Sequence, residues 1–423
     1  MYVHRIKVED VVEKRPALIN ADKLAWFSEK SVYLTAFFLP ISMPVMAVCL
    51  FLGWGCWLVS AYHRKDFSLH RTKLDKWVWG FAFLAGISVI QSSNLTYSIL
   101  NYLILFAHYL GFYHLVVQYI RTTADLKRLV WTILAAAVIV VGYGFIQAVI
   151  ATDVQGHAWV DPSQFADIKF RVYSTLENPN LLAGFLVMMD AFLLGFAYKI
   201  KDRRVRMWLL GLFVIFSACL GLTYSRGAWI SLLAVMVAGS LAYGRNTWWV
   251  VILVPLALFF FSDSFADRIM SIIHPVDTSA SLRLALWEST MAMIRDYPLT
   301  GIGWGAYLWT YPAYDFFIQN PDVKIFHAHN MYLHMMAEVG IPAFLLFAAI
   351  IVRTVYMAVR VAKRSADKWL AGMAMGVIAA MLSLLVNGVT DHILFNIQLS
   401  MFFWMMVAAA YRAHSIMNEE NKI

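Results

Sequence analysis

The stretch LVWTILAAAVIVVGYGFIQAVI, residues 129–150, decides the fold class of this chain. It contains no charged residue, and it exceeds the roughly 20 residues that a helix needs to cross a bilayer. Similar apolar runs recur along the 423 residues, of which 61% are hydrophobic and only 14% charged. A soluble domain is about 25% charged. The composition therefore argues against a soluble enzyme, a disordered protein, a coiled coil and a secreted disulfide scaffold, and it predicts a multi-span membrane protein.

We predict an all-α integral membrane protein with about twelve transmembrane helices and a large extracytoplasmic loop that contains interfacial helices. The predicted spans are 24–41, 43–62, 77–95, 98–120, 129–150, 180–198, 207–224, 227–244, 246–262, 331–357, 369–388 and 393–411. Pro40 and Pro44 interrupt the first two. A tight helical hairpin is the preferred interpretation there. One long kinked helix is the alternative, and it would reverse the orientation of everything that follows. Residues 1–423 are interpreted as a single polytopic membrane domain.

The distribution of basic residues predicts the orientation. If the N-terminus is cytoplasmic, 27 of the 34 Lys and Arg lie inside or can reach the inner face. Only seven fall outside: Lys169, Arg171, Arg226, Arg268, Arg283, Arg295 and Lys324. The outer side carries the two longest loops and is still the poorer in basic residues, which is the positive-inside pattern. Both termini are therefore expected in the cytoplasm, and the net charge of +8 indicates a membrane face rather than a nucleic-acid partner.

Two long outer segments are expected to carry function, because long loops in a compact protein are usually functional or disordered. They are the first extracytoplasmic loop, 151–179, and the large loop, 263–330, which is rich in aromatic and aliphatic residues. Within the second, residues 281–294 lack Gly and Pro and follow the capping-type cluster 277–279, which predicts an interfacial helix that ends before Pro298. The segment Gly301-Ile302-Gly303-Trp304-Gly305 has neither the strand nor the Lys-Ser/Thr of a phosphate-binding loop. It predicts a tight turn at the membrane interface, anchored by Trp304.

Two outer arginines are candidates for binding an anion. Arg226 lies in a turn between two apolar spans, where an arginine is costly unless it is paired or faces water. Arg283 and Trp287 are four residues apart on the predicted helix and share a face, so the aromatic ring could brace the guanidinium. A braced arginine presents its fork to a phosphate in a fixed geometry. The alternatives are an arginine that reaches lipid headgroups and an ordinary surface arginine.

His329 is the candidate general base, since a neutral histidine has a pKa near working pH. It precedes the tenth predicted span in the segment His327-Ala328-His329-Asn330. No carboxylate pattern accompanies the two histidines, and their alternate spacing is expected to splay the rings apart, so no metal site is predicted. The three cysteines, Cys49, Cys56 and Cys219, lie in apolar runs and also lack metal-ligand spacing. Lesser candidates on the outer side are Arg171, Glu177, Asn178, Asn180, Asp391 and His392. Glu177-Asn178-Pro179-Asn180 is typical of a turn and helix cap, and Asp391-His392 is interpreted as a polar pair at a span end.

Four motifs together resemble the O-antigen ligase/O-antigen polymerase superfamily, a group of bacterial polysaccharide ligase-type membrane glycosyltransferases. In chain order they are Glu177-Asn178-Pro179-Asn180, Ser225-Arg226-Gly227, the Arg283-to-Trp287 helix with Pro298-Leu299-Thr300-Gly301-Ile302-Gly303, and His329-Asn330 with Glu338 and Gly340. The resemblance covers roughly residues 170–345 by motif and the whole chain by span count. It implies that Arg226 and Arg283 bind the pyrophosphate of an undecaprenyl-pyrophosphate-linked glycan donor and that His329 deprotonates the acceptor hydroxyl. Supporting roles would fall to Trp287, Asn330, Glu338, Arg171 and Glu177.

The resemblance further implies an inverting glycosyltransferase that needs no metal or other cofactor and acts on the periplasmic face of a bacterial inner membrane. A ligase would transfer the glycan to lipid A-core, in lipopolysaccharide biosynthesis. A polymerase would transfer it to a second lipid-linked repeat. The single dominant outer loop and the span count favour the ligase. A lipid-linked sugar flippase is a third hypothesis, but it predicts charges at mid-span depth, where Asp190 is the clearest example.

Overall fold

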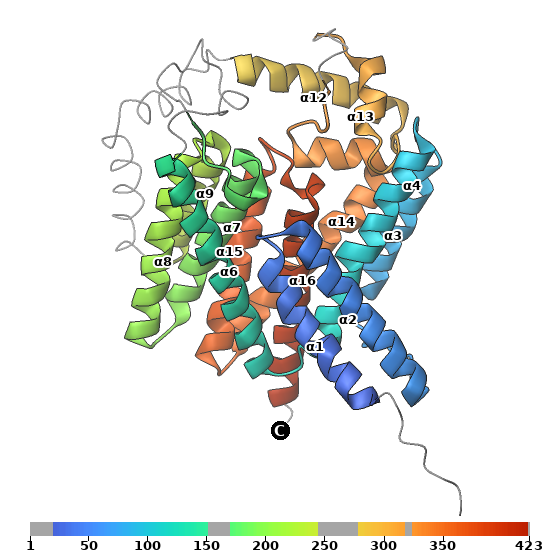
Figure 1. Ribbon diagram of the computed structural model, residues 1–423. Helices are drawn as coiled ribbons and strands as arrows, with labels where there is room; N and C mark the ends of the chain where they lie inside the picture. Colours follow the sequence, from blue (N-terminus) through green and yellow to red (C-terminus); the bar gives the residue numbers. More distant parts are fainter. Residues whose placement is uncertain (1–19, 151–169, 244–277, 318–323, 422–423) are drawn as a thin grey trace, which may run out of the picture.

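The computed structural model describes residues 20–150, 170–243, 278–317 and 324–421, and all regular elements in these ranges are helical (Figure 1). The α-helices are α1 (Ala21–Phe38), α2 (Met43–Arg64), α3 (Asp75–Val89), α4 (Leu95–Ile104), α5 (Gly111–Tyr119), α6 (Thr123–Ile150), α7 (Pro179–Lys199), α8 (Arg203–Leu222), α9 (Arg226–Tyr243), α12 (Thr278–Asp296), α13 (Tyr307–Thr310), α14 (Met331–Arg364), α15 (Lys368–Asn387) and α16 (Ile397–Glu420). A π-helical turn, η1 (Leu105–Leu110), joins α4 to α5. Short 3-10 turns are η3 (Ser174–Leu176), η5 (Tyr311–Tyr314) and η6 (Ile393–Phe395). The predicted all-α class is confirmed.

The chain is a multi-pass membrane protein. Seven described segments are long and apolar enough to cross a membrane: Met43–Arg64, Leu95–Tyr119, Thr123–Ile150, Pro179–Lys199, Arg203–Leu222, Met331–Arg364 and Lys368–Asn387. Each predicted span coincides with a helix, except 246–262, which lies outside the described residues. The count of about twelve stays a prediction, because α1 carries several charged residues and α3 has only 15 residues.

The first two helices form the preferred hairpin, not a single kinked helix. Their far ends are tied together, because Ser60 Oγ donates to the carbonyl of Ala21 at 2.8 Å and Arg64 pairs with Asp22 at 2.7 Å. Gly53 lies in α2 between these contacts and the turn that joins α1 to α2, and its lack of a side chain lets the two helices approach closely. A Cβ at Gly53 would lie 2.0 Å from Ser31 Oγ. Figure 1 shows α1 and α2 side by side in blue, as the hairpin interpretation predicts.

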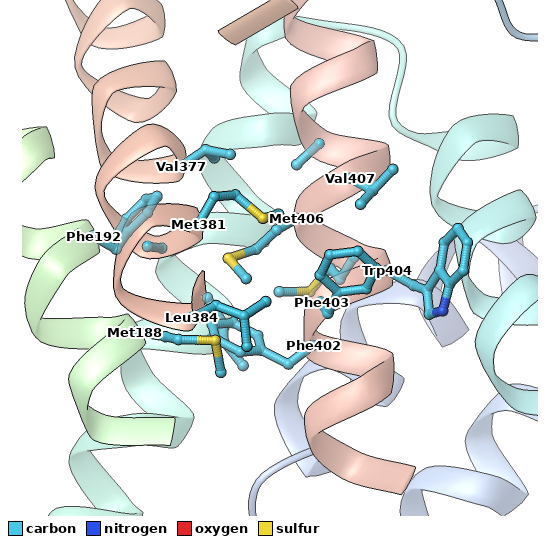
Figure 2. Packing of buried hydrophobic residues seen from close by; sticks show 14 of the residues in the cluster. Met188, Phe192, Val377, Met381, Leu384, Phe402, Phe403, Trp404, Met406 and Val407 are labelled. Carbon is cyan, nitrogen blue, oxygen red and sulfur yellow. The ribbon is translucent and has the colours of Figure 1, made fainter. Parts of the chain in front are cut away.

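The centre of the bundle is a core shared by α7, α15 and α16 (Figure 2). Its labelled side chains are Met188 and Phe192 from α7, Val377, Met381 and Leu384 from α15, and Phe402, Phe403, Trp404, Met406 and Val407 from α16. Glycines let α7 and α15 touch through their backbones: a Cβ at Gly195 would lie 2.5 Å from the carbonyl oxygen of Met375. Small residues at such contacts are how membrane helices gain van der Waals packing. This packing positions the segment between α15 and α16.

The two ends of the bundle are different. The start of α1 and the end of α16 lie at one end, whereas α12 and α13 lie across the other (Figure 1). The predicted interfacial helix 281–294 is contained in α12, which begins at Thr278 and ends at Asp296, before Pro298. A small separate core beneath α12 consists of Leu286, Met293, Ile294, Ile302, Ala306, Tyr307, Tyr311, Ala328 and Ala337. It attaches α12 and α13 to the start of α14.

Candidate active site

The turn at 298–303 docks onto a kink in α14. At Gly340 the helix leaves helical geometry, with φ 77° and ψ 164°. Two residues later, Pro342 has no N–H, so the carbonyl of Glu338 cannot receive its usual helical hydrogen bond. The N–H of Gly303 donates to that carbonyl instead, at 3.0 Å. The turn at 298–303 and the kink at Gly340, which are far apart in the sequence, therefore form one structural unit.

This contact requires glycine on both sides. The φ of Gly301 is 71°, and a Cβ there would lie 2.4 Å from the carbonyl oxygen of Glu338. A Cβ at Gly340 would lie 2.3 Å from the carbonyl oxygen of Leu299. The N–H of Ile302 completes the contact by donating to the carbonyl of Ala337 at 2.8 Å. The prediction of a tight turn is confirmed, and its glycines permit close approach to α14.

Trp304 anchors the turn to the protein. Its indole Nε1 donates to the carbonyl of Asn101 in α4 at 3.2 Å, and its backbone N–H donates to Ser88 Oγ in α3 at 3.0 Å. Its ring also packs edge-on against Phe81. Trp304, the anchor expected at the membrane interface, thus holds the turn against α3 and α4.

Asn330 places His329 at the start of α14. The Asn330 side chain accepts from the N–H groups of Tyr332 and Leu333, both at 3.0 Å, which caps the helix. Its amide also donates to the carbonyl of Val389 at 3.1 Å. His329 itself has a positive φ of 49°, an uncommon conformation for a residue other than glycine. The capped helix start is therefore tied to the segment between α15 and α16.

Asp391 brings a carboxylate to His329 from that segment. The Asp391 Oδ1 and His329 Nδ1 atoms are 3.1 Å apart, although the residues are 62 positions apart in sequence. The expectation that no carboxylate accompanies the histidines is therefore wrong. The expectation of splayed rings is also wrong, because the ring centroids of His327 and His329 are 4.2 Å apart. The reason is local: the left-handed turn at His329 lets its N–H donate to His327 Nδ1 at 3.2 Å.

A cluster of buried histidines surrounds this pair. His327 stacks on Phe395, and the rings of His334 and His392 have centroids 4.2 Å apart. The pKa of His327 is lowered to about 3, mainly by burial; the neighbouring His329 and Arg283 add to this lowering, and Asp391 opposes it. Burial likewise holds the pKa of His392 well below its usual value. Both imidazoles are therefore neutral at pH 7.

Asp391 is ionised in this environment. Burial raises its pKa, but the hydrogen bond from His329 and the electrostatic effect of the surrounding groups, which include Arg283, outweigh burial. The net pKa lies below the usual range for a carboxyl. The contact between Asp391 and His392 is made by the backbone N–H of His392, which donates to Asp391 Oδ1 at 2.8 Å. The side chain of Asp391 thus pairs with His329 and not with its sequence neighbour.

Helix α12 carries Arg283 to the same cluster. The helix is tied down by Thr290 Oγ1, which is 2.7 Å from Tyr307 OH, and the N–H of Tyr307 donates to Glu338 Oε1 at 3.2 Å. Arg283 is partly buried, and its charge acts on both His327 and Asp391. Arg283 therefore belongs to the electrostatic surroundings of His329, and buried Glu338 supports the attachment of α12.

The start of α9 places Arg226 beside the Asp391 segment. A Cβ at Gly227 would lie 2.3 Å from Thr390 Oγ1, so a larger residue would require the Thr390 side chain to move. Arg171 supports the turn before α9, because its Nε donates to the carbonyl of Thr223 at 2.8 Å. A second nitrogen of the same guanidinium donates to Asn180 Oδ1 at the start of α7, also at 2.8 Å. Arg171 is buried and acts as a structural link between α7 and the turn that precedes Arg226.

The remaining candidates are placed as follows. Asn178 caps α7 by accepting from the N–H groups of Asn180 and Leu181, and Pro179 is the first residue of that helix, so the predicted cap is confirmed. Glu177 is exposed in the turn before it, with a φ of 59°. Trp287 is partly buried on α12, and its indole Nε1 is buried without a hydrogen-bond partner in the described structure. The proposed bracing of the Arg283 guanidinium by the Trp287 ring stays a prediction.

His327, His329 and Asp391 also form a possible metal-ligand set. One potential ligand atom from each lies within 4.8 Å of the others. Two imidazoles and a carboxylate suit Zn²⁺ chemically. The closest contact in the set, between His329 Nδ1 and Asp391 Oδ1 at 3.1 Å, is within hydrogen-bond distance. The arrangement is therefore compatible with an oriented base and with a cation site.

A comparison with known protein families finds a match to the central part of the chain. Residues 210–348 match the model of the O-antigen ligase family, which supports the O-antigen ligase/polymerase superfamily and a glycosyltransferase-type function. A search of curated proteins found no match. The matched region runs from α8 into α14 and contains Arg226, Arg283 and His329, whereas Asp391 lies beyond it.

Proposed function

Because the matched family is that of O-antigen ligases, we propose that this protein transfers a glycan from an undecaprenyl-pyrophosphate carrier to an acceptor hydroxyl. The preferred acceptor is lipid A-core, and the protein lies in a bacterial inner membrane with its active site on the periplasmic face. The observation that carries the proposal is the pairing of His329 with Asp391 at 3.1 Å, within the field of Arg283. Helix α14 begins two residues after His329, and this start lies at the end of the bundle that α12 covers (Figure 1).

His329 is the proposed general base. An ionised Asp391 favours the tautomer in which His329 Nδ1 carries a proton, and this tautomer leaves Nε2 able to accept one. The His329 side chain is 31% exposed, whereas that of Asp391 is only 12% exposed. A substrate hydroxyl can therefore reach the histidine, and the buried carboxylate orients it and stabilises the imidazolium that forms. Asp391 is thus a positioning residue for the base.

Arg226 and Arg283 are the proposed contacts for the pyrophosphate. As His329 takes the hydroxyl proton, the acceptor oxygen bonds to the anomeric carbon, and the bond from that carbon to the phosphate oxygen breaks. The electron pair leaves with undecaprenyl pyrophosphate, and attack from the opposite face inverts the anomeric centre. Two fixed guanidinium groups can stabilise the charge that develops on the leaving group without a metal ion.

Reconstitution with two alternative acceptors tests the proposal. The purified protein receives a lipid-pyrophosphate glycan together with either lipid A-core or a second lipid-linked repeat. Extension of lipid A-core supports the ligase. Extension of the lipid-linked repeat alone would replace it with the polymerase. Movement of the donor across the membrane with neither acceptor extended would favour the flippase.

The same assay tests metal independence. We expect transfer to survive EDTA, because the proposed chemistry uses an oriented base and two arginines. Loss of transfer that a divalent ion restores would show that His327, His329 and Asp391 hold a catalytic metal. Glu177 would then be examined as a further ligand.

A further inference from the structure

A second candidate site lies at the opposite end of α14 from His329. A cavity of about 140 Å³ is lined by Lys73, Leu74, Arg353, Tyr356, Met357, Arg360 and His414. These residues come from the segment before α3, the C-terminal half of α14 and the last turns of α16. An engineered cavity of roughly 150 Å³ accepts a benzene-sized molecule. This cavity can therefore hold a single phosphate group but not a glycan or a nucleotide.

His414 provides a buried, unsatisfied polar atom at this cavity. The residue is 93% buried, its Nδ1 lies 3.1 Å from Asn418 Nδ2, and its Nε2 is buried without a partner in the described structure. If the Asn418 amide donates to Nδ1, the imidazole proton resides on Nε2. His414 then has a donor that lacks an acceptor. A buried unsatisfied donor is costly, and an anionic oxygen in the cavity would satisfy it.

The cavity also gathers positive charge. Arg360 and Lys73 are the charged groups close enough to act electrostatically on His414. Within the described ranges, neither they nor Arg353 forms an ion pair. Arg353 instead lies over the ring of Trp77, 4.7 Å from its centroid, and the Nε of Arg360 is buried without a partner in the same ranges. The described residues that line the cavity therefore include several cationic side chains and no carboxylate.

We infer that this cavity binds the headgroup phosphate of an anionic phospholipid. The apolar side chains of Leu74 and Met357 contribute to its wall beside the cations, an amphiphilic lining that suits a lipid better than a free anion. Val352, one residue before Arg353, is 67% exposed on a helix of membrane-spanning length, which is where acyl chains would lie. Basic pockets between membrane helices are known to bind such headgroups. The site is separate from His329, so the inference does not rest on the proposed transferase reaction.

Lipid binding to the full-length purified protein tests this inference. Native mass spectrometry would measure binding of phosphatidylglycerol, with phosphatidylcholine as the neutral lipid and inorganic phosphate as the free anion. We expect phosphatidylglycerol to bind at least about tenfold more tightly than phosphatidylcholine. Arg360→Gln should weaken that binding by about tenfold, since it removes a charge-assisted contact. Lys73→Gln, on a different element, should weaken it in the same direction.

Arg364→Gln is the matched control, because Arg364 is an exposed arginine at the same end of α14 that does not line the cavity. Its phosphatidylglycerol binding should stay within about twofold of the unmodified protein. Equal losses in the Arg360 and Arg364 variants would overturn the inference in favour of general surface charge. Equal binding of the two lipids, or displacement of the lipid by inorganic phosphate at the same concentration, would also overturn it. Thermal unfolding of each variant separates lost binding from lost folding, and Lys73→Gln decides the question if Arg360→Gln does not fold.

Discussion

At the scale of single residues, backbone conformation places the candidate base as much as side-chain chemistry does. The positive φ of His329 turns the chain so that its N–H meets His327 and its ring meets Asp391. His327 is neutral and its side chain is 12% exposed, whereas the His329 side chain is 31% exposed. Two histidines two residues apart therefore have different environments, and this difference can be measured.

Replacing His329 tests the base directly. His329→Ala should lower turnover by roughly 10²–10⁴, the usual contribution of general-base catalysis, while binding of the lipid-pyrophosphate donor stays near normal. His327→Ala should retain more activity than His329→Ala. The measurement is donor binding to each folded variant beside its transfer rate. Loss of donor binding in His329→Ala, or transfer at the unmodified rate, would show that the base assignment is wrong.

The two arginines should respond differently from the histidine. Each charge-assisted contact with phosphate contributes roughly 1.5–3 kcal/mol, so Arg226→Ala or Arg283→Ala should slow transfer at least about tenfold. Lysine keeps the charge but not the fork, so the lysine variants should recover activity only in part. Transfer rates and donor affinity are compared for alanine and lysine at each position. Full activity in either alanine variant would remove that arginine from the pyrophosphate site.

Acid should destabilise the histidine cluster. The folded-state pKa of His327 is lowered to about 3 and that of His392 is also lowered, so below about pH 6.5 the unfolded chain binds protons that the folded chain does not. The free energy of unfolding therefore falls as the pH drops below this value. Asp391, whose pKa is also lowered, adds to the loss below about pH 4. Thermal unfolding of the detergent-solubilised protein should show a smaller decrease between pH 7.5 and 5 for His327→Asn. An unchanged pH dependence would contradict the assigned environment of His327.

At the scale of elements, the kink in α14 organises the site. It exposes carbonyl groups that a regular helix would use internally, and the turn at 298–303 supplies N–H donors to them. The same turn is continuous with α12, so the contact also sets the position of Arg283 relative to His329. A defect at this contact should therefore reduce activity without touching any reacting group.

Gly301→Ala tests that contact. A Cβ at Gly301 would overlap the carbonyl of Glu338, and the φ of 71° disfavours alanine. We expect a destabilisation of roughly 2–4 kcal/mol together with loss of transfer. Gly211→Ala in α8 is the control, because a Cβ there has no atom within 4 Å and alanine favours a helix by about 0.5–1 kcal/mol. Equal thermal stability of the two variants would argue against a required contact between 298–303 and α14.

At the scale of the whole molecule, the two ends of the bundle are distinguished by charge and by shape. The predicted outer end carries α12, α13 and the start of α14, and the other end carries the start of α1, the end of α16 and the connection between α7 and α8 (Figure 1). Opposite ends of one helix, α14, thus carry the proposed transferase site and the proposed lipid site. Both proposals require that the ends face opposite sides of the membrane.

Cysteine labelling measures this orientation. In a background that lacks Cys49, Cys56 and Cys219, Glu177→Cys and Ala313→Cys should react with a membrane-impermeant reagent from outside. Lys201→Cys, between α7 and α8, should react only after the membrane is opened. All three positions are exposed in the structure, so accessibility within the protein is matched. Labelling of position 201 from outside would reverse the orientation and move His329 to the cytoplasm.

The sequence by itself determined the fold class and the positions of most membrane helices, because apolar length, proline breaks and caps act locally; it favoured the hairpin at the start but left a single kinked helix as the alternative. It also predicted α12, since a capping cluster and Pro298 bound that helix in the chain itself. His329, Arg226 and Arg283 could be chosen as candidates because ionisable side chains are rare and costly near a membrane span.

Only the tertiary structure decided which of these residues meet. Asp391 reaches His329 because α15 and α16 pack at the centre of the bundle and carry the segment between them to the start of α14. The need for glycine at 301 and 340 becomes clear only from the close approach of their backbones in the folded protein. Arg171 is a structural link only because Thr223 and Asn180 lie beside it. Such contacts depend on the packing of helices far apart in sequence, and no local pattern of residues encodes the distance between them.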